Sequence, residues 1–85
     1  MQETRQYRGI SKRLAADYLG NLGGERVGGD DRLEGDGWSA VLSAETVEVA
    51  GSMELTEVTV AFEGEAVVLE ELIEDFTRKA MRAGG

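Results

Sequence analysis

The chain has 85 residues, a formal net charge of −8, and no Cys or His. Without these two residue types, cysteine nucleophiles, disulfides, thiolate zinc sites and histidine general bases are excluded. The opening MQETRQYRGI lacks the apolar stretch of a signal peptide, and no apolar run approaches a membrane-spanning length. We therefore expect a single cytoplasmic α+β domain over residues 1–85 that is not an enzyme, has no cofactor or metal, and has no membrane partner.

Charge is distributed unevenly along the chain. Residues 1–13 and 78–85 each carry a net charge of +3, while residues 14–77 carry sixteen acids against two arginines. Acid excess with only two lysines is typical of a high-salt, halophilic cytoplasm. The acidic body would repel phosphates, so nucleic acid is not an expected partner. If the basic residues near the two ends converge, they predict a surface for an acidic partner, a nucleotide or a small anion. The alternative is that they compensate the helix dipole and pair with the acidic body. These residues are Arg5, Arg8, Arg78, Lys79 and Arg82.

The first half of the chain predicts a strand, a helix and a hairpin. Residues 4–10 form a short strand, and Ser11 is placed to cap the helix that follows. Leu14, Tyr18 and Leu22 recur at helical spacing, and Gly23-Gly24 ends this helix. Asp36-Gly37 is a dipeptide favoured in type I′ turns, and it links a strand at 32–34 to one starting at Trp38.

Two further strands are expected at 46–49 and across MELTEVTVAFEG. In the latter, the apolar residues change from odd positions at Met53 and Leu55 to even positions from Val58 onward. A one-residue slip places side chains on the opposite face, so we expect a bulge near residues 56–57. Trp38 is interpreted as a core residue. A metal site at the loop acids is disfavoured by their spacing. A phosphate cradle at the 23–29 glycines is disfavoured because no lysine follows them in a G-K-[ST] arrangement and the neighbouring acids repel phosphate.

Residues 65–83 give the clearest helix. Its apolar stripe comprises Leu69, Leu72, Ile73, Phe76 and Ala80. We expect ion pairs between Glu74 and Arg78 and between Asp75 and Lys79, four residues apart. The predicted order is strand, helix, about four strands, helix. An antiparallel sheet with two helices on one face lets both helices bury their apolar sides, which is a two-layer α+β fold.

The segments RQYRGI, LGG, GDGW, VTVAFEG and FTRKAMRAGG resemble the C-terminal domain associated with archaeal molybdopterin-synthase sulfur-carrier proteins. This resemblance implies a β-α-β4-α fold of the TATA-binding-protein-like type. The diglycine Gly84-Gly85 also resembles the end of small archaeal ubiquitin-like modifier proteins. It departs from their β-grasp fold in one respect, because there the diglycine follows a strand and here it follows a predicted helix.

Two functions remain open at this point. In the first, the chain is a ubiquitin-like modifier or sulfur carrier, and an adenylating (E1-like) enzyme activates the Gly85 carboxylate. The preceding Gly84 has no side chain and so fits a narrow active-site channel. In the second, it is a non-catalytic accessory module that binds a sulfur-carrier or molybdopterin-synthase protein. Gly84-Gly85 then only ends the helix, since glycine is enriched just past helix ends.

Overall fold

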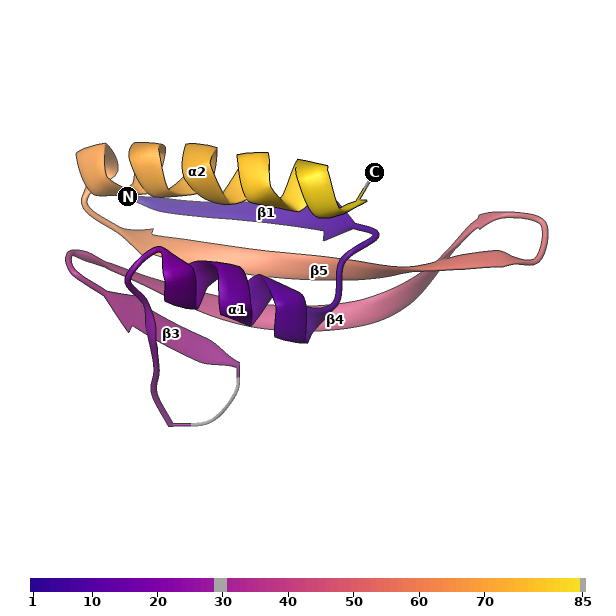
Figure 1. Ribbon diagram of the computed structural model, residues 1–85, viewed down its shortest axis with the longest axis horizontal. Helices are drawn as coiled ribbons and strands as arrows, with labels where there is room; N and C mark the ends of the chain where they lie inside the picture. The colour runs from indigo at the N-terminus through magenta and orange to yellow at the C-terminus, as the bar shows by residue number, and fades with distance from the viewer. Residues whose placement is uncertain (29–30, 85) are drawn as a thin grey trace.

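The computed structural model describes residues 1–28 and 31–84, and it shows an α+β protein (Figure 1). The elements, in chain order, are β1 (Gln2–Arg8), α1 (Lys12–Asn21), β2 (Glu25–Arg26), β3 (Arg32–Gly35), β4 (Trp38–Ala50), β5 (Met53–Gly64) and α2 (Ala66–Gly84). The five strands form one sheet in the order β1-β5-β4-β3-β2, and every neighbouring pair is antiparallel. The predicted fold class and antiparallel sheet are confirmed.

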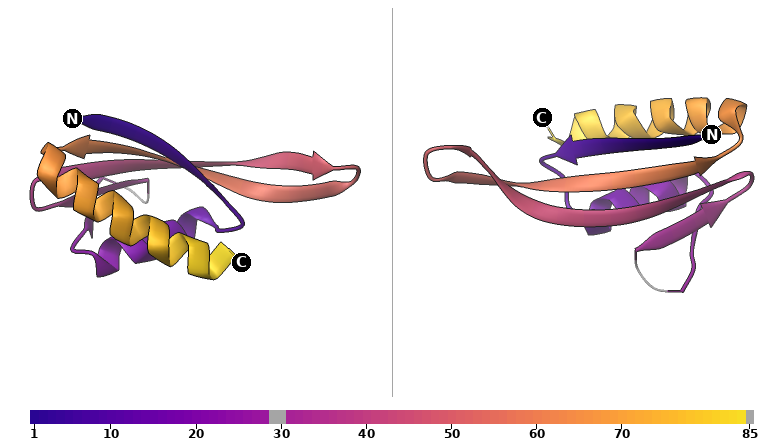
Figure 2. Two further views of the ribbon diagram at one scale, coloured as in Figure 1. Left: turned by 90° about the horizontal axis from the view of Figure 1, so that it is seen from above. Right: turned by 180° about the vertical axis from the view of Figure 1, so that it is seen from behind.

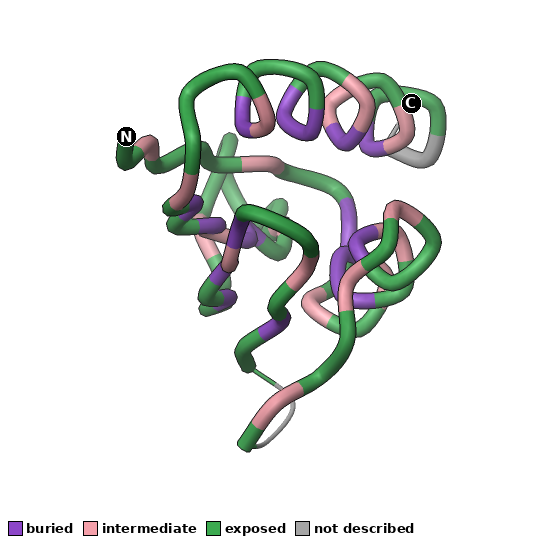
Figure 3. Tube along the Cα trace, turned by 90° about the vertical axis from the view of Figure 1, so that its left-hand side faces the viewer, coloured by how far each residue is buried: buried purple, intermediate pink, exposed green. Residues whose placement is uncertain are grey.

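Both helices lie on the same side of the sheet (Figure 2). Helix α1 contacts β3 and β4, and helix α2 contacts β5 and α1. Side chains alternate along each strand, so Val58, Val60 and Phe62 of β5 all point toward the helices, where at most 1% of their surface is exposed. The buried positions of α2 lie on its sheet-facing side (Figure 3). The predicted apolar stripe of α2 is therefore confirmed.

Helix α1 begins as predicted but buries a different face. The Ser11 hydroxyl accepts a hydrogen bond from the Leu14 amide at 3.0 Å, which confirms the N-cap. Gly23, with φ +101°, follows the last turn and confirms the predicted end of the helix. The buried residues are Ala15, Ala16 and Leu19, whereas the predicted face of Leu14, Tyr18 and Leu22 is only partly buried. Small alanines allow the helix to approach the sheet closely, and the larger side chains lie at the margin.

The central hairpin corrects the prediction of separate strands at 38–43 and 46–49. Strand β4 runs unbroken for 13 residues and pairs with the 12-residue β5. The expected bulge at 56–57 is wrong, because pairing is regular there and the register shift lies between Glu48 and Ala50. The hairpin extends beyond the helices, which explains the change from even to odd apolar positions. Where the helices cover the sheet, apolar residues occupy the side that faces them. Beyond the helices that side has no core to face, and the apolar residues lie on the opposite side.

Two smaller corrections concern turns and edges. Loop residues 36–37 join β3 to β4 as predicted, but only Gly37 has a positive φ, so the turn is not type I′, which needs positive φ at both residues. The two-residue strand β2, which the sequence pattern does not predict, pairs with β3. Strand β1 spans residues 2–8 rather than 4–10.

The Trp38 indole makes Gly35 a position that tolerates no side chain. A Cβ added to Gly35 would lie 2.2 Å from the Trp38 ring, whereas one added to Gly20 in α1 meets nothing within 4 Å. We expect Gly35→Ala to lower the free energy of unfolding by roughly 1–3 kcal/mol through overpacking. The matched change Gly20→Ala should raise it by about 0.5–1 kcal/mol, because alanine is the better helix former. Urea unfolding followed by Trp38 fluorescence measures both, and equal stabilities would contradict the packing described.

Candidate functional site

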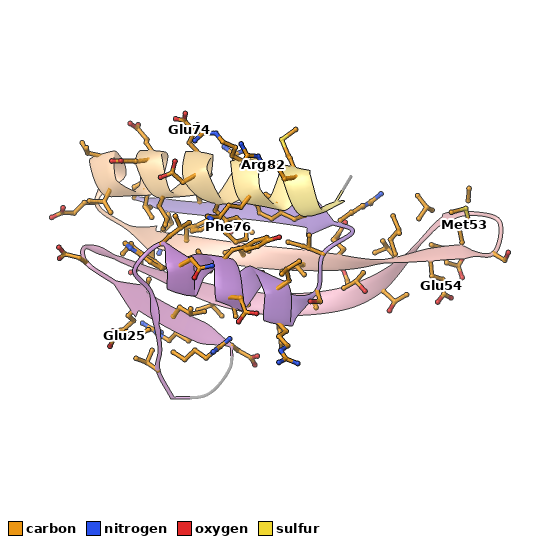
Figure 4. All side chains as sticks on the ribbon, viewed as in Figure 1. Glu25, Met53, Glu54, Glu74, Phe76 and Arg82 are labelled. Atoms are coloured by element: carbon orange, nitrogen blue, oxygen red, sulfur yellow. The ribbon has the colours of Figure 1, made fainter. Side chains whose placement is uncertain are left out.

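The candidate site is the end of α2, beyond the predicted apolar stripe. Ala80 is 4% exposed, whereas Met81 is 70% exposed and Arg82 is also exposed (Figure 4). Gly84 is the final residue of α2, and Gly85 lies outside the described residues. The predicted conjugation residue Gly84 therefore belongs to a helix rather than to an extended tail.

Arg78 forms ion pairs with two acids of the preceding turn of α2. Arg78 contacts Glu74 at 3.0 Å, which confirms the first predicted pair. The second predicted pair is wrong, because Asp75 contacts Arg78 at 3.4 Å instead of Lys79. The Lys79 ammonium lies 6.0 Å from the centre of the Tyr18 ring, at the outer limit of a cation–π contact. Arg78 is thus engaged within its own helix.

The two predicted basic residues of β1 point to opposite faces of the sheet. Arg5 is paired across the strands with Val60, on the helix side, and contacts Glu3 at 2.9 Å. Arg8 is paired with Glu57 on the side of the sheet that the helices do not cover, and its Nε donates to a Glu57 carboxylate oxygen at 2.9 Å. The Glu57 side chain is only 8% exposed, so Arg8 balances a buried charge. The structure does not bring Arg5 and Arg8 onto one surface.

A groove between β1 and α2 contains Arg5. It has a volume of ≈ 380 Å³ and is lined by Met1, Glu3, Arg5, Glu70, Ile73, Glu74 and Thr77. Three of these residues are acids, so the groove surrounds Arg5 with carboxylates rather than with further cations. A small anion is not favoured here.

A second hollow, not predicted from the sequence, lies beside the start of α1. Its volume is ≈ 530 Å³, and its lining residues are Lys12, Arg13, Ala16, Arg26 and Asp31. Lys12 contacts Asp31 at 2.5 Å, and Arg26 contacts Asp17 at 3.1 Å. The signal in the sequence was the absence of acids from the first turn of α1, where two cations stand instead. Two of its three cations are engaged by neighbouring carboxylates.

Residues 1–28 and 31–84 contain no group of three or more acids placed to hold a metal ion. Asp30, one of the loop acids weighed as a ligand, lies outside these residues. No helix in the described segments is long and apolar enough to cross a bilayer.

A match to a protein-family model shows to which family this chain belongs. A family model described as archaeal MoaD-like protein matches residues 3–85. The chain belongs to the archaeal MoaD-like protein family. A comparison with curated proteins found no match. The family match confirms the resemblance to archaeal sulfur-carrier proteins, and it includes the Gly84-Gly85 pair of this MoaD-like chain.

In this MoaD-like chain, Tyr7 attaches β1 to the C-terminal half of α2. Its hydroxyl is 2.8 Å from the Thr77 hydroxyl, and its ring meets Phe76 edge-on with the centroids 4.9 Å apart. Burial raises the pKa of the Tyr7 phenol above its ordinary value, and the Thr77 hydrogen bond opposes this shift. The helix that carries the diglycine is therefore anchored one turn before its exposed end.

We expect Tyr7→Phe to lower the free energy of unfolding near neutral pH by about 0.5–1.5 kcal/mol, the usual contribution of one hydrogen bond. Because the pKa is raised in the folded state, the unfolded phenol loses its proton first. Wild-type stability should then fall as the pH rises through the ordinary tyrosine pKa of about 10 toward the folded-state pKa. Tyr7→Phe should lack this part of the alkaline decline.

The matched control is Thr77→Val, which removes the same hydrogen bond but keeps the titrating phenol. It should lose similar stability near neutral pH and retain the alkaline decline. Urea unfolding at neutral and alkaline pH measures both variants. An identical pH profile for Tyr7→Phe and wild type would contradict the assignment.

Proposed function

We propose that this protein is a small carrier or ubiquitin-like modifier whose Gly85 carboxylate is activated by an adenylating enzyme. The carboxylate attacks the α-phosphate of ATP, pyrophosphate leaves, and an acyl-adenylate forms. Sulfide then displaces AMP to give a thiocarboxylate, or a lysine amine displaces AMP to give an amide. The family match supports this proposal because it extends through residue 85.

The observation that carries the proposal is the exposure of Met81 and Arg82. Because both side chains lie outside the core, unwinding α2 at Met81 and Arg82 removes neither of them from the core. Terminal turns open at little free-energy cost. The five residues 81–85, fully extended, would reach roughly 17 Å, at 3.3–3.6 Å per residue. Side-chain-free Gly84 and Gly85 would then allow the end of this tail to enter a narrow channel.

We further propose that residues 1–85 form one domain of the two-layer TATA-binding-protein-like type, with the order β-α-β4-α. The observed element order and the shared side of both helices support it. In this proposal the diglycine begins at the last residue of a helix, unlike the diglycine of the β-grasp fold. The tail is made by unwinding the end of α2, whose residues 81–84 are helical in the resting structure.

A second candidate is a non-catalytic accessory module of molybdopterin or sulfur-carrier biosynthesis. It is favoured by the position of Gly84 inside α2, where the glycine ends a helix. Its partner would be a sulfur-carrier or molybdopterin-synthase protein, and its contacts would come from the sheet or from the basic residues near the termini, of which Arg82 is exposed. Neither candidate requires the chain itself to catalyse a reaction.

Replacing Gly84 and Gly85 together by alanine separates the two candidates. We expect the variant to fold with wild-type stability and to lose all thiocarboxylate and all conjugates, because the reacting end no longer fits the activating enzyme. Intact and tryptic mass spectrometry of protein from producing cells is the measurement, and it also establishes whether Gly85 carries the free carboxylate. Gly20→Ala is the matched glycine control and should be modified normally. An unmodified wild-type Gly85, in cells where other modifiers are conjugated, would contradict the carrier proposal and leave the accessory module.

A further inference from the structure

The outer part of the β4–β5 hairpin, residues 46–55, projects from the rest of the molecule (Figures 1 and 2). Pairing of β1 with β5 ends at Arg8↔Glu57, and pairing of β3 with β4 starts at Arg32↔Val41. The radius of gyration is 12.7 Å. About 12 Å is expected for a compact chain of this length. We call residues 46–55 the projecting hairpin.

The projecting hairpin has one apolar face and one polar face. The cross-strand pairs Val47↔Leu55 and Ala50↔Met53 share the first face, and Glu48↔Glu54 lies on the second. Met53 and Glu54 point to opposite sides in Figure 4. The register shift leaves Val49 beside Ala50, opposite the single residue Met53. Val49 is 45% exposed and Met53 is 63% exposed.

These apolar side chains do little for the stability of the fold. They lie beyond the buried core, whose last members on the two strands are Leu42 and Val58. A two-stranded ribbon gains little stability of its own in water, and exposed apolar strands invite unwanted association. Threonine would maintain the strands equally well without that liability. An apolar face kept at a projecting tip is therefore suited to contact with another molecule.

The charges around the apolar face indicate which kind of molecule the projecting hairpin contacts. Between residues 33 and 77 the chain has no Lys or Arg, and Glu45, exposed on the same face as Val47, borders the apolar patch. A second copy of this chain would bring glutamates against glutamates, which opposes self-association. We propose that the projecting hairpin docks into an apolar groove of a partner protein whose rim carries Lys or Arg side chains.

The position of the projecting hairpin determines on which side of the molecule a docked partner lies. The projecting hairpin extends past the same end of the molecule at which α2 ends (Figure 1). A partner that holds the hairpin is therefore positioned on the side where Gly84 lies. The docking itself does not depend on any chemistry at Gly85, so the two proposals are tested separately.

The test uses the full chain with the photoreactive residue benzoylphenylalanine in place of Met53, irradiated in producing cells. Val67, 78% exposed at the start of α2, is the control position for the same probe. Mass spectrometry of the cross-linked peptides identifies the contact. We expect one protein to be joined at position 53 and not at position 67, through a peptide whose structure forms an apolar groove bordered by Lys or Arg.

Two double variants then test the chemistry of the contact. Val47→Thr with Leu55→Thr removes apolar surface, and Glu45→Lys with Glu48→Lys reverses the charge. Each should lower the cross-link yield at position 53 about tenfold, the scale of losing an interface anchor. Glu70→Lys with Glu71→Lys makes the same change in net charge on α2 and should leave the yield unchanged. The Gly84→Ala, Gly85→Ala variant should also cross-link normally.

Five results would overturn the proposal, and four of them concern the hairpin itself. The first is cross-linking of the same proteins at positions 53 and 67, and the second is cross-linking only to a second copy of this chain. The third is a cross-link yield that survives both double variants. The fourth is a large fall in thermal midpoint for Val47→Thr with Leu55→Thr. The fourth result would assign these side chains to the stability of the fold. Loss of cross-linking in the diglycine variant would place the contact at the tail instead of the hairpin.

Discussion

The ring of Phe76 is the contact on which the arrangement of the elements depends. It belongs to α2, and it meets Tyr7 of β1, Tyr18 of α1 and Phe62 of β5 edge-on, with centroid distances of 4.9, 6.3 and 6.0 Å. Edge-to-face contacts add to the free energy of burying the rings themselves. One side chain thus fixes both helices against the sheet and holds the edge strand in place. A chain of 85 residues buries too little surface to spare such a contact.

The parts of the fold that could be predicted are those in which one local rule decides the outcome. The stripe through Leu69, Ile73 and Phe76 repeats over several turns, so its period identifies the helix and its buried side. Ser11 needs only a nearby amide to act as a cap. The remaining features depend on neighbours distant in sequence. The phase change around Glu57 arises where the hairpin leaves the helices, and the two-residue strand β2 exists because β3 lies beside it.

The candidate site likewise has one part that local sequence predicts and another that depends on residues distant in the chain. A helix running up to the diglycine could be predicted, and the structure shows Gly84 in that helix. The partners of the basic residues could not be predicted, because they depend on register. Arg5 and Arg8 are three residues apart in one strand, so alternation alone puts them on opposite faces. Only the alignment of β1 with β5 places Arg8 against the buried carboxylate of Glu57. Charge counting along the sequence cannot separate a cation available to a partner from one already balancing an acid.

The pairing of β1 with β5 also sets the order of events during folding. The β4–β5 hairpin closes through a two-residue loop, whereas the pairs between β1 and β5 join residues 49 to 61 positions apart in the chain. Loop-closure entropy makes such distant contacts slow to form. We therefore expect the hairpin to assemble early and the first strand to dock late. Tyr7 reaches the Phe76 ring only then, so the final packing of the last helix waits for the first residues of the chain.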